Sequence, residues 1–520
     1  MKTYIVYKDE HAVHVYDIAD DKFFDVEDIK DAGLDKRDFL IVCNQEFLIR
    51  NKQIDICIVE KMIYFPGPKN LQRLFQKYTH KSFEDENKIK SIIKAIHTVY
   101  KKQQPWIKEL KLERAVLFNS EIAGTIAYIN IGKIKIKDSY IKEQEEIREK
   151  LHYTGQMGRN ELISYMESKK YGCLDIVTGK YNLTHKHLLS FGDEVLNKHI
   201  EISSKKSEYL HYSQFAKKEI PINHKPYGAI TGRITTSNPN IQGINPSIIE
   251  GNIWSFDFTG FEIMIYLCLY KKSICDDFIY SKKKDIYGYI FFELYPDKYG
   301  YDSDEFKSNN PDTRKHFKDL CIKVLYGATL DDCKYMFGDK IEKMYNKVFN
   351  YFDVSRVKKE LLDYATKSGS YLLNNKYKLS TSDEHVNILH KLLPEAKKVS
   401  LPEDDPSYYS DHPKNKAIKA EFHDIFTKER GILLEVADKF KKVKKYVVNY
   451  NIQATGAIII KLAAKYAIAT GMKSKILILR HDEIIADIVT ENDKREILYA
   501  MEDACKEVIL AYIHVDMKKL

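Results

Sequence analysis

Residues 476–485, with the sequence ILILRHDEII, place two adjacent acidic side chains at the bend between two apolar runs. The apolar runs predict two strands joined by a tight turn, with Asp482 and Glu483 in that turn. An unpaired carboxylate is costly in such apolar surroundings, and this arrangement is typical of a place that holds a metal ion. The sequence therefore raises the question of which divalent-metal chemistry the chain performs and where the other ligand lies.

The best candidate for the second ligand is Asp257, in the stretch IWSFDFTGFE at 253–262. Asp257 ends an apolar strand, and Glu262 follows on the next helical turn. Phosphoryl transfer with two divalent ions needs carboxylates that bridge ions about 3.5–4 Å apart. Magnesium accepts one or two carboxylates plus phosphate oxygens, so two aspartates from separate strands suffice. Taken alone, Asp257 fits a turn or cap residue better.

A third stretch, RKHFKDLCIKVLYG at 314–327, predicts a basic amphipathic helix. Arg314, Lys318, Ile322 and Tyr326 are spaced four residues apart, which places them along one helix face about 18 Å long. The two cations at one end could meet phosphates, and the aromatic end could meet a base. As an isolated pattern, however, it favours an ordinary surface helix.

The composition of the chain restricts the class of protein but does not indicate a function. The chain has 520 residues, 44% hydrophobic and 30% charged, and a formal net charge of +8, all ordinary for a globular protein of several units. Its lysine clusters are compatible with nucleic-acid binding but favour a solvated surface. We see no signal peptide and no apolar run of the roughly 18–20 residues that span a bilayer. The eight scattered cysteines contain no CxxC pair, which predicts reduced thiols and no structural zinc.

The order of the three stretches resembles motifs A, B and C of the family A DNA polymerases, the DNA polymerase I-like enzymes. Two more segments carry the same resemblance: TGRITTSNPNIQ at 231–242 is similar to the TGRLSS…PNLQN run of that family, and KYVVNYNIQ at 445–453 is similar to its R-x3-N-x-P-x-Q helix. The resemblance covers roughly 105–520 and is firmest from 227 to 490.

The resemblance implies a template-directed DNA polymerase that joins deoxynucleotides to a primer 3′-hydroxyl. It implies that two Mg²⁺ ions, for which Mn²⁺ could substitute, are held by the side chains of Asp257 and Asp482 and the carbonyl of Phe258. It also implies that Glu483, beside Asp482, supports the site. The cationic helix would grip the triphosphate, with Lys318 as proton donor to pyrophosphate and Ile322 and Tyr326 nearer the base. The remaining matched positions are Glu262 as steric gate against a ribose 2′-hydroxyl, His481 at the primer terminus, and three minor-groove contacts to the primer–template: Arg233, Asn449 and Gln453.

Several positions depart from the family pattern. Ile322 replaces an aromatic residue and Lys323 replaces Gly, which puts aromatic stacking on the incoming nucleotide in doubt. Tyr287 replaces a His that normally helps to bind triphosphate. Three further replacements lie outside the nucleotide grip: Lys445 for Arg, Asn451 for Pro and Met264 for Arg. The sequence thus predicts a divergent member of the family.

The expected architecture is α+β, a right hand of palm, fingers and thumb behind a small α/β unit. Palm segments are expected at 105–136, 215–284 and 431–520, the thumb at 137–214 and the fingers at 285–430. Residues 66–104 are expected to form a helical connector. Residues 1–65 resemble a truncated, inactive remnant of an RNase H-like 3′–5′ exonuclease domain, with Leu48 where an acid would be expected, so proofreading is not expected.

Two rival functions remain open at this point. A single-subunit RNA polymerase shares the palm, although Glu262 and the run at 231–242 favour DNA. A catalytically dead nucleic-acid-binding module would not need the metal acids. The expected partners are primer–template DNA, deoxynucleotides and replisome or processivity factors, for a monomer that has no membrane association and works in the cytoplasm, the host's if the chain is viral. The AT-rich residue usage suggests a phage, plasmid or parasite replication enzyme.

Overall fold

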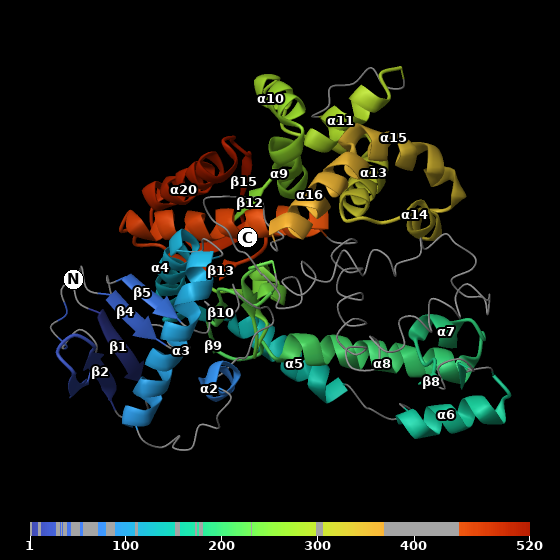
Figure 1. Ribbon diagram of the computed structural model, residues 1–520. Helices are drawn as coiled ribbons and strands as arrows, with labels where there is room; N and C mark the ends of the chain where they lie inside the picture. The colour runs from blue at the N-terminus through green and yellow to red at the C-terminus, as the bar shows by residue number, and fades with distance from the viewer. Residues whose placement is uncertain are drawn as a thin grey trace, which may run out of the picture.

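The computed structural model describes residues 3–8, 12–27, 32, 34, 39–42, 52–55, 71–79, 89–109, 113–150, 157–171, 174–175, 180–229, 231–297, 305–368 and 447–520. A sheet and its covering helices form the centre of the molecule. An N-terminal unit lies on one side of this centre, and two groups of helices extend from the other side (Figure 1). The α+β class predicted from the sequence agrees with this mixture of helices and sheets.

The central sheet contains β12 (Ile253–Phe258), β13 (Lys475–Leu479), β14 (Glu483–Asp487) and β15 (Val515–Lys519) in the order β13-β14-β12-β15. Every neighbouring pair is antiparallel. The predicted strand–turn–strand is therefore present, and its second strand pairs directly with the strand that ends near Asp257. Residues more than 200 positions apart in the sequence meet in this sheet. Helices α9 (Phe261–Tyr270) and α20 (Glu491–Ile509) pack with it.

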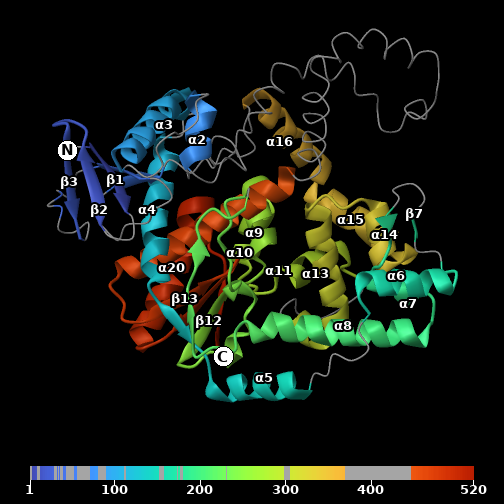
Figure 2. The same ribbon diagram turned by 90° about the horizontal axis from the view of Figure 1, so that it is seen from below.

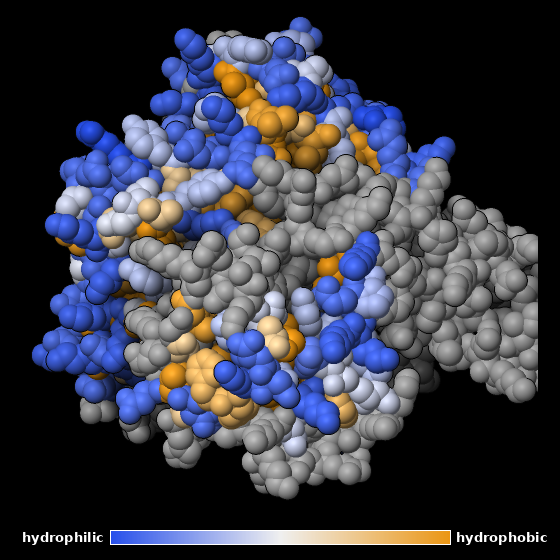
Figure 3. Space-filling model, turned by 60° about the vertical axis from the view of Figure 1, so that its left-hand side comes forward, coloured by the Kyte–Doolittle hydropathy of each residue, from blue (hydrophilic) through white to orange (hydrophobic). Residues whose placement is uncertain are grey.

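One long helix, Val447–Ala469, crosses the same core. By length and composition it could span a membrane, but 72% of its most apolar window is buried inside the protein. A core helix passes the same test, and Val447, Ile452, Ile459 and Ala463 belong to the main hydrophobic cluster. The face of the molecule in Figure 3 is covered mainly by hydrophilic side chains with smaller hydrophobic areas between them.

The segment before this core differs from the expectation. The sequence TIAYINI at 125–131 predicts a strand from its β-branched and aromatic side chains, but these residues lie mostly in helix α4 (Glu113–Asn130). Ile122, Ile126 and Ile129 follow a helical spacing and are all buried, so packing overrides the strand preference of β-branched side chains. A small ladder follows: β6 (Lys133–Lys135) pairs with β9 (Glu219–Pro221), and β10 (His224–Lys225) pairs with β11 (Thr235–Thr236). Two short 3-10 turns, η2 (Ile241–Gly243) and η3 (Pro246–Ile248), lead into β12.

The N-terminal unit has a five-stranded sheet in the order β3-β2-β1-β4-β5. The strands are β1 (Thr3–Lys8), β2 (Val13–Asp17), β3 (Lys22–Val26), β4 (Phe39–Val42) and β5 (Lys52–Asp55). Helices α2 (Leu71–Thr79) and α3 (Ile89–Glu109) share a hydrophobic core with β1 and β4 through Ile5, Ile41, Leu74 and Ile96. Helices α2 and α3 thus pack on this sheet, and the division of the chain at 66–104 stays a prediction. Leu48 lies outside the described residues, and the exonuclease resemblance stays a prediction.

Two helical groups flank the central sheet (Figures 1 and 2). The first, in the predicted thumb, contains α5 (Asp138–Lys150), α6 (Arg159–Ser168), α7 (His185–Leu189) and α8 (Glu194–Ser213), with the short ladder β7 (Leu174–Asp175) and β8 (Lys180–Tyr181). The end of this group that is farther from the central sheet has a separate small core.

The second helical group lies in the predicted fingers and at the junction with the palm. It contains α10 (Lys272–Tyr280), α11 (Ile286–Leu294), α12 (Phe306–Asn309), α13 (Pro311–Leu325), α14 (Leu330–Phe337), a 3-10 turn η5 (Asp339–Ile341), α15 (Glu342–Phe352) and α16 (Val354–Ser368). The rest of the predicted fingers, 369–430, lies outside the described residues.

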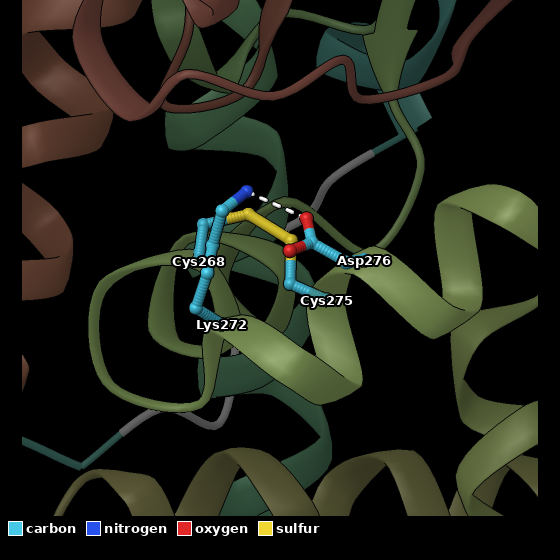
Figure 4. Close-up of a disulfide and its surroundings, with 4 residues drawn as sticks. All are labelled: Cys268, Lys272, Cys275 and Asp276. Atoms are coloured by element: carbon cyan, nitrogen blue, oxygen red, sulfur yellow. Dashed lines mark hydrogen bonds and ion pairs between the residues drawn. A yellow bond between two sulfur atoms is a disulfide. The ribbon is translucent and has the colours of Figure 1, made fainter.

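The cysteines correct one expectation. Cys268 on α9 and Cys275 on α10 form a disulfide, with their Cα atoms 5.4 Å apart. The prediction that all the cysteines are reduced is wrong for this pair, because the sharp junction at Lys271 folds α10 back toward α9. Figure 4 shows the bond beside the ion pair of Lys272 with Asp276. Three others are free and buried (Cys321, Cys333 and Cys505), and the remaining three lie outside the described residues.

Candidate active site

The sheet register brings the predicted metal acids together. Asp257 near the end of β12 is paired with Glu483 of β14 on one side and with Asp516 of β15 on the other. The N–H of Phe258 donates to the carbonyl of Asp482 at 3.0 Å, which fixes the β13–β14 turn against the end of β12. Directly paired residues of antiparallel strands project to the same face. Three carboxylates from three strands therefore gather at this edge, with Asp482 beside them.

This concentration of negative charge changes the acidity of both aspartates. The pKa of Asp257 is raised to about 7, chiefly because the surrounding protein withdraws it from water and then because Asp482 and Glu483 repel its charge. The pKa of Asp482 is also raised, by burial and by the charges of Glu262 and Glu483. Lys318 opposes the shift at both aspartates. The site is thus short of positive charge, a condition that a bound cation would relieve.

The donor chemistry fits a hard divalent cation such as Mg²⁺, which takes oxygen ligands and needs only one or two carboxylates from the protein. Within the described ranges, no group of three or more His, Cys, Asp or Glu side chains has the geometry of a complete metal site. The fit therefore rests on the two aspartates. The ring of Phe258, at the end of β12, is buried and stacks on the ring of Phe261 at 4.5 Å.

Glu483 is held on both oxygens. The hydroxyl of Ser255 donates to Oε1 at 2.5 Å, and Nη1 of Arg480 donates to Oε2 at 2.8 Å. The backbone of Arg480 also donates to the carbonyl of Glu483 at 2.9 Å, which closes the hairpin turn. Glu483 is therefore a fixed neighbour of the two aspartates, and its supporting role stays a prediction. Ser255 and Arg480 were missed, although strand alternation places Ser255 on the same face as Asp257.

The predicted steric gate has two partners. Nη2 of Arg233 donates to Oε1 of Glu262 at 2.8 Å, and both side chains are about four-fifths buried. The Tyr326 hydroxyl also bonds to Glu262, and burial together with this carboxylate raises the pKa of Tyr326, while a bond to Gln453 acts in the opposite direction. Four residues predicted from four separate segments thus form one cluster. Arg233 contacts the gate here, although it was assigned to the minor groove.

The cationic helix is α13, and it is one residue shorter than the pattern: it ends at Leu325, with Tyr326 as its C-cap and Gly327 in a left-handed conformation. Lys318 is close enough to the two aspartates to influence both. Arg314 instead makes a bidentate ion pair with Asp285, at 2.7 and 2.8 Å. Asp285, which also caps α11, was missed; its signal is the acid immediately before an apolar helix.

The remaining predicted residues lie around this cluster. Ile322 is partly buried on α13. Asn449 and Gln453 lie one turn apart on the helix Val447–Ala469, both partly buried. His481 lies in the β13–β14 turn with much of its surface open to solvent, and partial withdrawal of its ring from water, followed by the charge of Arg233, lowers its pKa. Lys445 lies outside the described residues.

Comparisons with known proteins support the same architecture. No family model matches the chain, and no curated protein matches it. Among solved structures, the POL domain of Pol1 from M. smegmatis, in complex with DNA primer-template and dNTP, matches with a TM-score of 0.71. The match covers 99% of this chain and 94% of that chain.

The chain has the fold of a family A DNA polymerase domain. At 14% identity the likeness establishes this polymerase fold and not the activity of individual residues. The sheet register and the hydrogen bond from the Phe258 N–H to the Asp482 carbonyl place Asp257 and Asp482 at one sheet edge.

Proposed function

We propose that the chain is a template-directed DNA polymerase that adds deoxynucleotides to a primer 3′-hydroxyl. The carrying observation is the pair Asp257 and Asp482, two carboxylates of raised pKa facing Lys318 in a polymerase fold. The Pol1 domain it resembles was solved with primer-template and dNTP, which supports the same partners here.

Asp257 and Asp482 would hold the divalent ions, Mg²⁺ or Mn²⁺, with the Phe258 carbonyl as a further ligand. When bound, such ions neutralise charge that develops during phosphoryl transfer. The protein's own contribution is positioning. Ser255 and Arg480 fix Glu483 beside the aspartates. Lys318, whose charge acts on both aspartates, is suited to give a proton to the departing pyrophosphate.

Substrate choice is proposed to depend on Glu262. Its carboxylate is tied to Arg233 and to Tyr326, which belong to different segments. A side chain restrained from two directions cannot swing away to admit a ribose 2′-hydroxyl, so deoxynucleotides should be favoured. This restraint argues against the rival reading as an RNA polymerase, and the intact acids argue against a dead binding module.

Primer extension on a defined template with Mg²⁺ tests the proposal. We expect incorporation of deoxynucleotides, with Asp257→Ala and Asp482→Ala abolishing extension while primer–template binding is retained. Equal use of ribonucleotides would favour the RNA polymerase alternative, and binding without extension by the unaltered chain would favour the dead module. A mismatched primer end should remain in place, because we propose that the N-terminal unit lacks exonuclease activity.

The biological setting is also a proposal. Residues 105–136, 215–284 and 431–520 would form the palm, 137–214 a thumb that contacts duplex phosphates, and 285–430 the fingers. Asn449, Gln453 and His481 would face the primer–template end. The expected enzyme is a monomer in the cytoplasm, viral or plasmid in origin, that works with processivity or replisome factors.

A further inference from the structure

Tyr287 occupies the centre of the predicted triphosphate grip. It lies on α11, one helix before the cationic helix, and only 3% of it is exposed. Both cations of α13 lie over its ring: Cζ of Arg314 is 5.1 Å from the ring centroid, and Nζ of Lys318 is 5.6 Å from it.

The ring is held rigidly from below. A Cβ atom built on Gly260 would approach Cγ2 of Ile286 to 2.4 Å and Cε2 of Tyr287 to 3.7 Å. The first turn of α11 therefore packs directly on the tight turn that follows Asp257, where Gly260 has φ +64°. Asp285 starts the same turn by accepting a hydrogen bond from the N–H of Tyr287. The aromatic face is thus fixed relative to the metal edge.

Arg314 is also fixed, because its Nε and Nη2, along one edge of the guanidinium, both donate to the carboxylate of Asp285. Lys318 makes no ion pair with a described residue; the ring of Tyr287 and the charges of the aspartates define its surroundings. A lysine side chain loses about 2 kcal/mol of rotamer freedom when it is held in one geometry. A preformed aromatic face reduces the freedom of the ammonium group before a ligand arrives, since the ring quadrupole attracts the cation.

We propose that Tyr287 is a positioning residue for the triphosphate of the incoming nucleotide, an aromatic platform that holds Arg314 and Lys318 side by side above the Gly260 turn. This inference rests on the proposed polymerase function and adds a role for a residue that departs from the family pattern. The role depends on the ring face and not on the hydroxyl. Tyr287→Phe should therefore preserve it, and Tyr287→Leu should remove it.

The test measures steady-state primer extension by the full chain, with separate KM and kcat for a deoxynucleotide. We expect Tyr287→Leu to raise KM about tenfold while kcat stays within threefold, in keeping with the strength of partly desolvated cation–π contacts. Tyr287→Phe should remain within threefold of the unaltered chain in both constants. Tyr289→Leu is the matched control, because Tyr289 lies on the same helix but contacts Phe278 instead of the cations.

Binding of inorganic tripolyphosphate, followed by calorimetry, provides a readout that needs no chemistry. Weaker binding by Tyr287→Leu, with none of this loss in Tyr289→Leu, supports the platform even if the unaltered chain extends no primer; that result would refute only the polymerase function. Unchanged KM and unchanged tripolyphosphate affinity in Tyr287→Leu would overturn the platform. If Tyr287→Leu does not fold, as judged by thermal melting, Tyr287→Met replaces it. Methionine fills similar space without an aromatic face, so KM should rise severalfold, and no rise would equally refute the role.

Discussion

Replacing Asp257 by Asn should stabilise the metal-free protein at alkaline pH while abolishing activity. In the folded chain the pKa of Asp257 is about 7, against a reference of 3.8. The folded state therefore binds this proton more tightly than the unfolded chain, and stability falls as pH rises from about 4 to 7. Above that window the charged carboxylate of Asp257 lowers the free energy of unfolding by its full amount, whereas the neutral amide of Asn has no such effect.

The size of the effect follows from the shift. A change of about three units would correspond to roughly 4 kcal/mol for a fully enclosed group, at 1.36 kcal/mol per unit. Asp257 keeps part of its surface open to solvent, so we discount the value to about 1–2 kcal/mol. For a large domain each kcal/mol shifts the melting temperature by about 2–4 °C.

Thermal melting of both proteins in EDTA, at pH 4 and pH 8, measures this effect. We expect Asp257→Asn to melt a few degrees higher at pH 8 and close to the unaltered chain at pH 4. Adding Mg²⁺ at pH 8 should raise the melting temperature of the unaltered chain more than that of the variant, because a ligand stabilises the state that binds it. Asp503→Asn, on the exposed side of α20, is the control. A variant that melts lower at pH 8, or a difference independent of pH, would refute the reasoning.

Three further predictions concern the gate, the hairpin and the disulfide. Glu262→Ala should raise ribonucleotide incorporation about 10- to 100-fold relative to deoxynucleotide, measured by competing the two in primer extension; an unchanged ratio would remove Glu262 from the gate. Nε2 of His224 accepts a hydrogen bond from the Leu479 N–H at 3.0 Å, and burial lowers the pKa of His224 to about 4. The contribution of the neutral ring to stability is therefore present above pH 6.5 and is lost as pH falls toward 4. His224→Ala should lower the free energy of unfolding in urea at pH 7 by about 2–3 kcal/mol and flatten that pH dependence. Reduction of the disulfide should destabilise the junction of α9 and α10 by about 2–3 kcal/mol in the chain-entropy model. We expect dithiothreitol to lower the melting temperature of the unaltered chain. It should not lower that of Cys275→Ser, because this variant has no disulfide to lose.

Much of the site could be predicted because its residues stand at local structural signals. Asp257 ends an apolar strand and Asp482 stands between two, so alternation and turn position identify both without a partner in view. The helical spacing of Arg314 and Lys318 likewise survives in the structure, where both side chains point toward the ring of Tyr287.

What sequence reasoning missed depends on contacts between distant segments. Asp285 pairs with Arg314 across 29 positions, and Ser255 reaches Glu483 across 228. Periodicity cannot indicate such pairs, because it describes one element at a time. The helix α4 was misread for a related reason: its isoleucines favour a strand locally, and only burial against the palm core decides for a helix. The disulfide depends in the same way on the junction at Lys271, which no spacing rule encodes.

The charged groups of the site divide into two kinds. Three arginines are already committed to internal carboxylates: Arg233 to Glu262, Arg314 to Asp285 and Arg480 to Glu483, each within 2.8 Å. A planar guanidinium makes directed bonds and is suited to fixing a neighbour in place. Lys318 is the cation whose charge lowers the pKa of both Asp257 and Asp482. Its ammonium group is a compact charge on a flexible stem. The three arginines thus fix carboxylates of the protein in place, and the flexible Lys318 lies near the two aspartates. A substrate that brings phosphates, together with cations for Asp257 and Asp482, would complete the balance of charge that the protein leaves open.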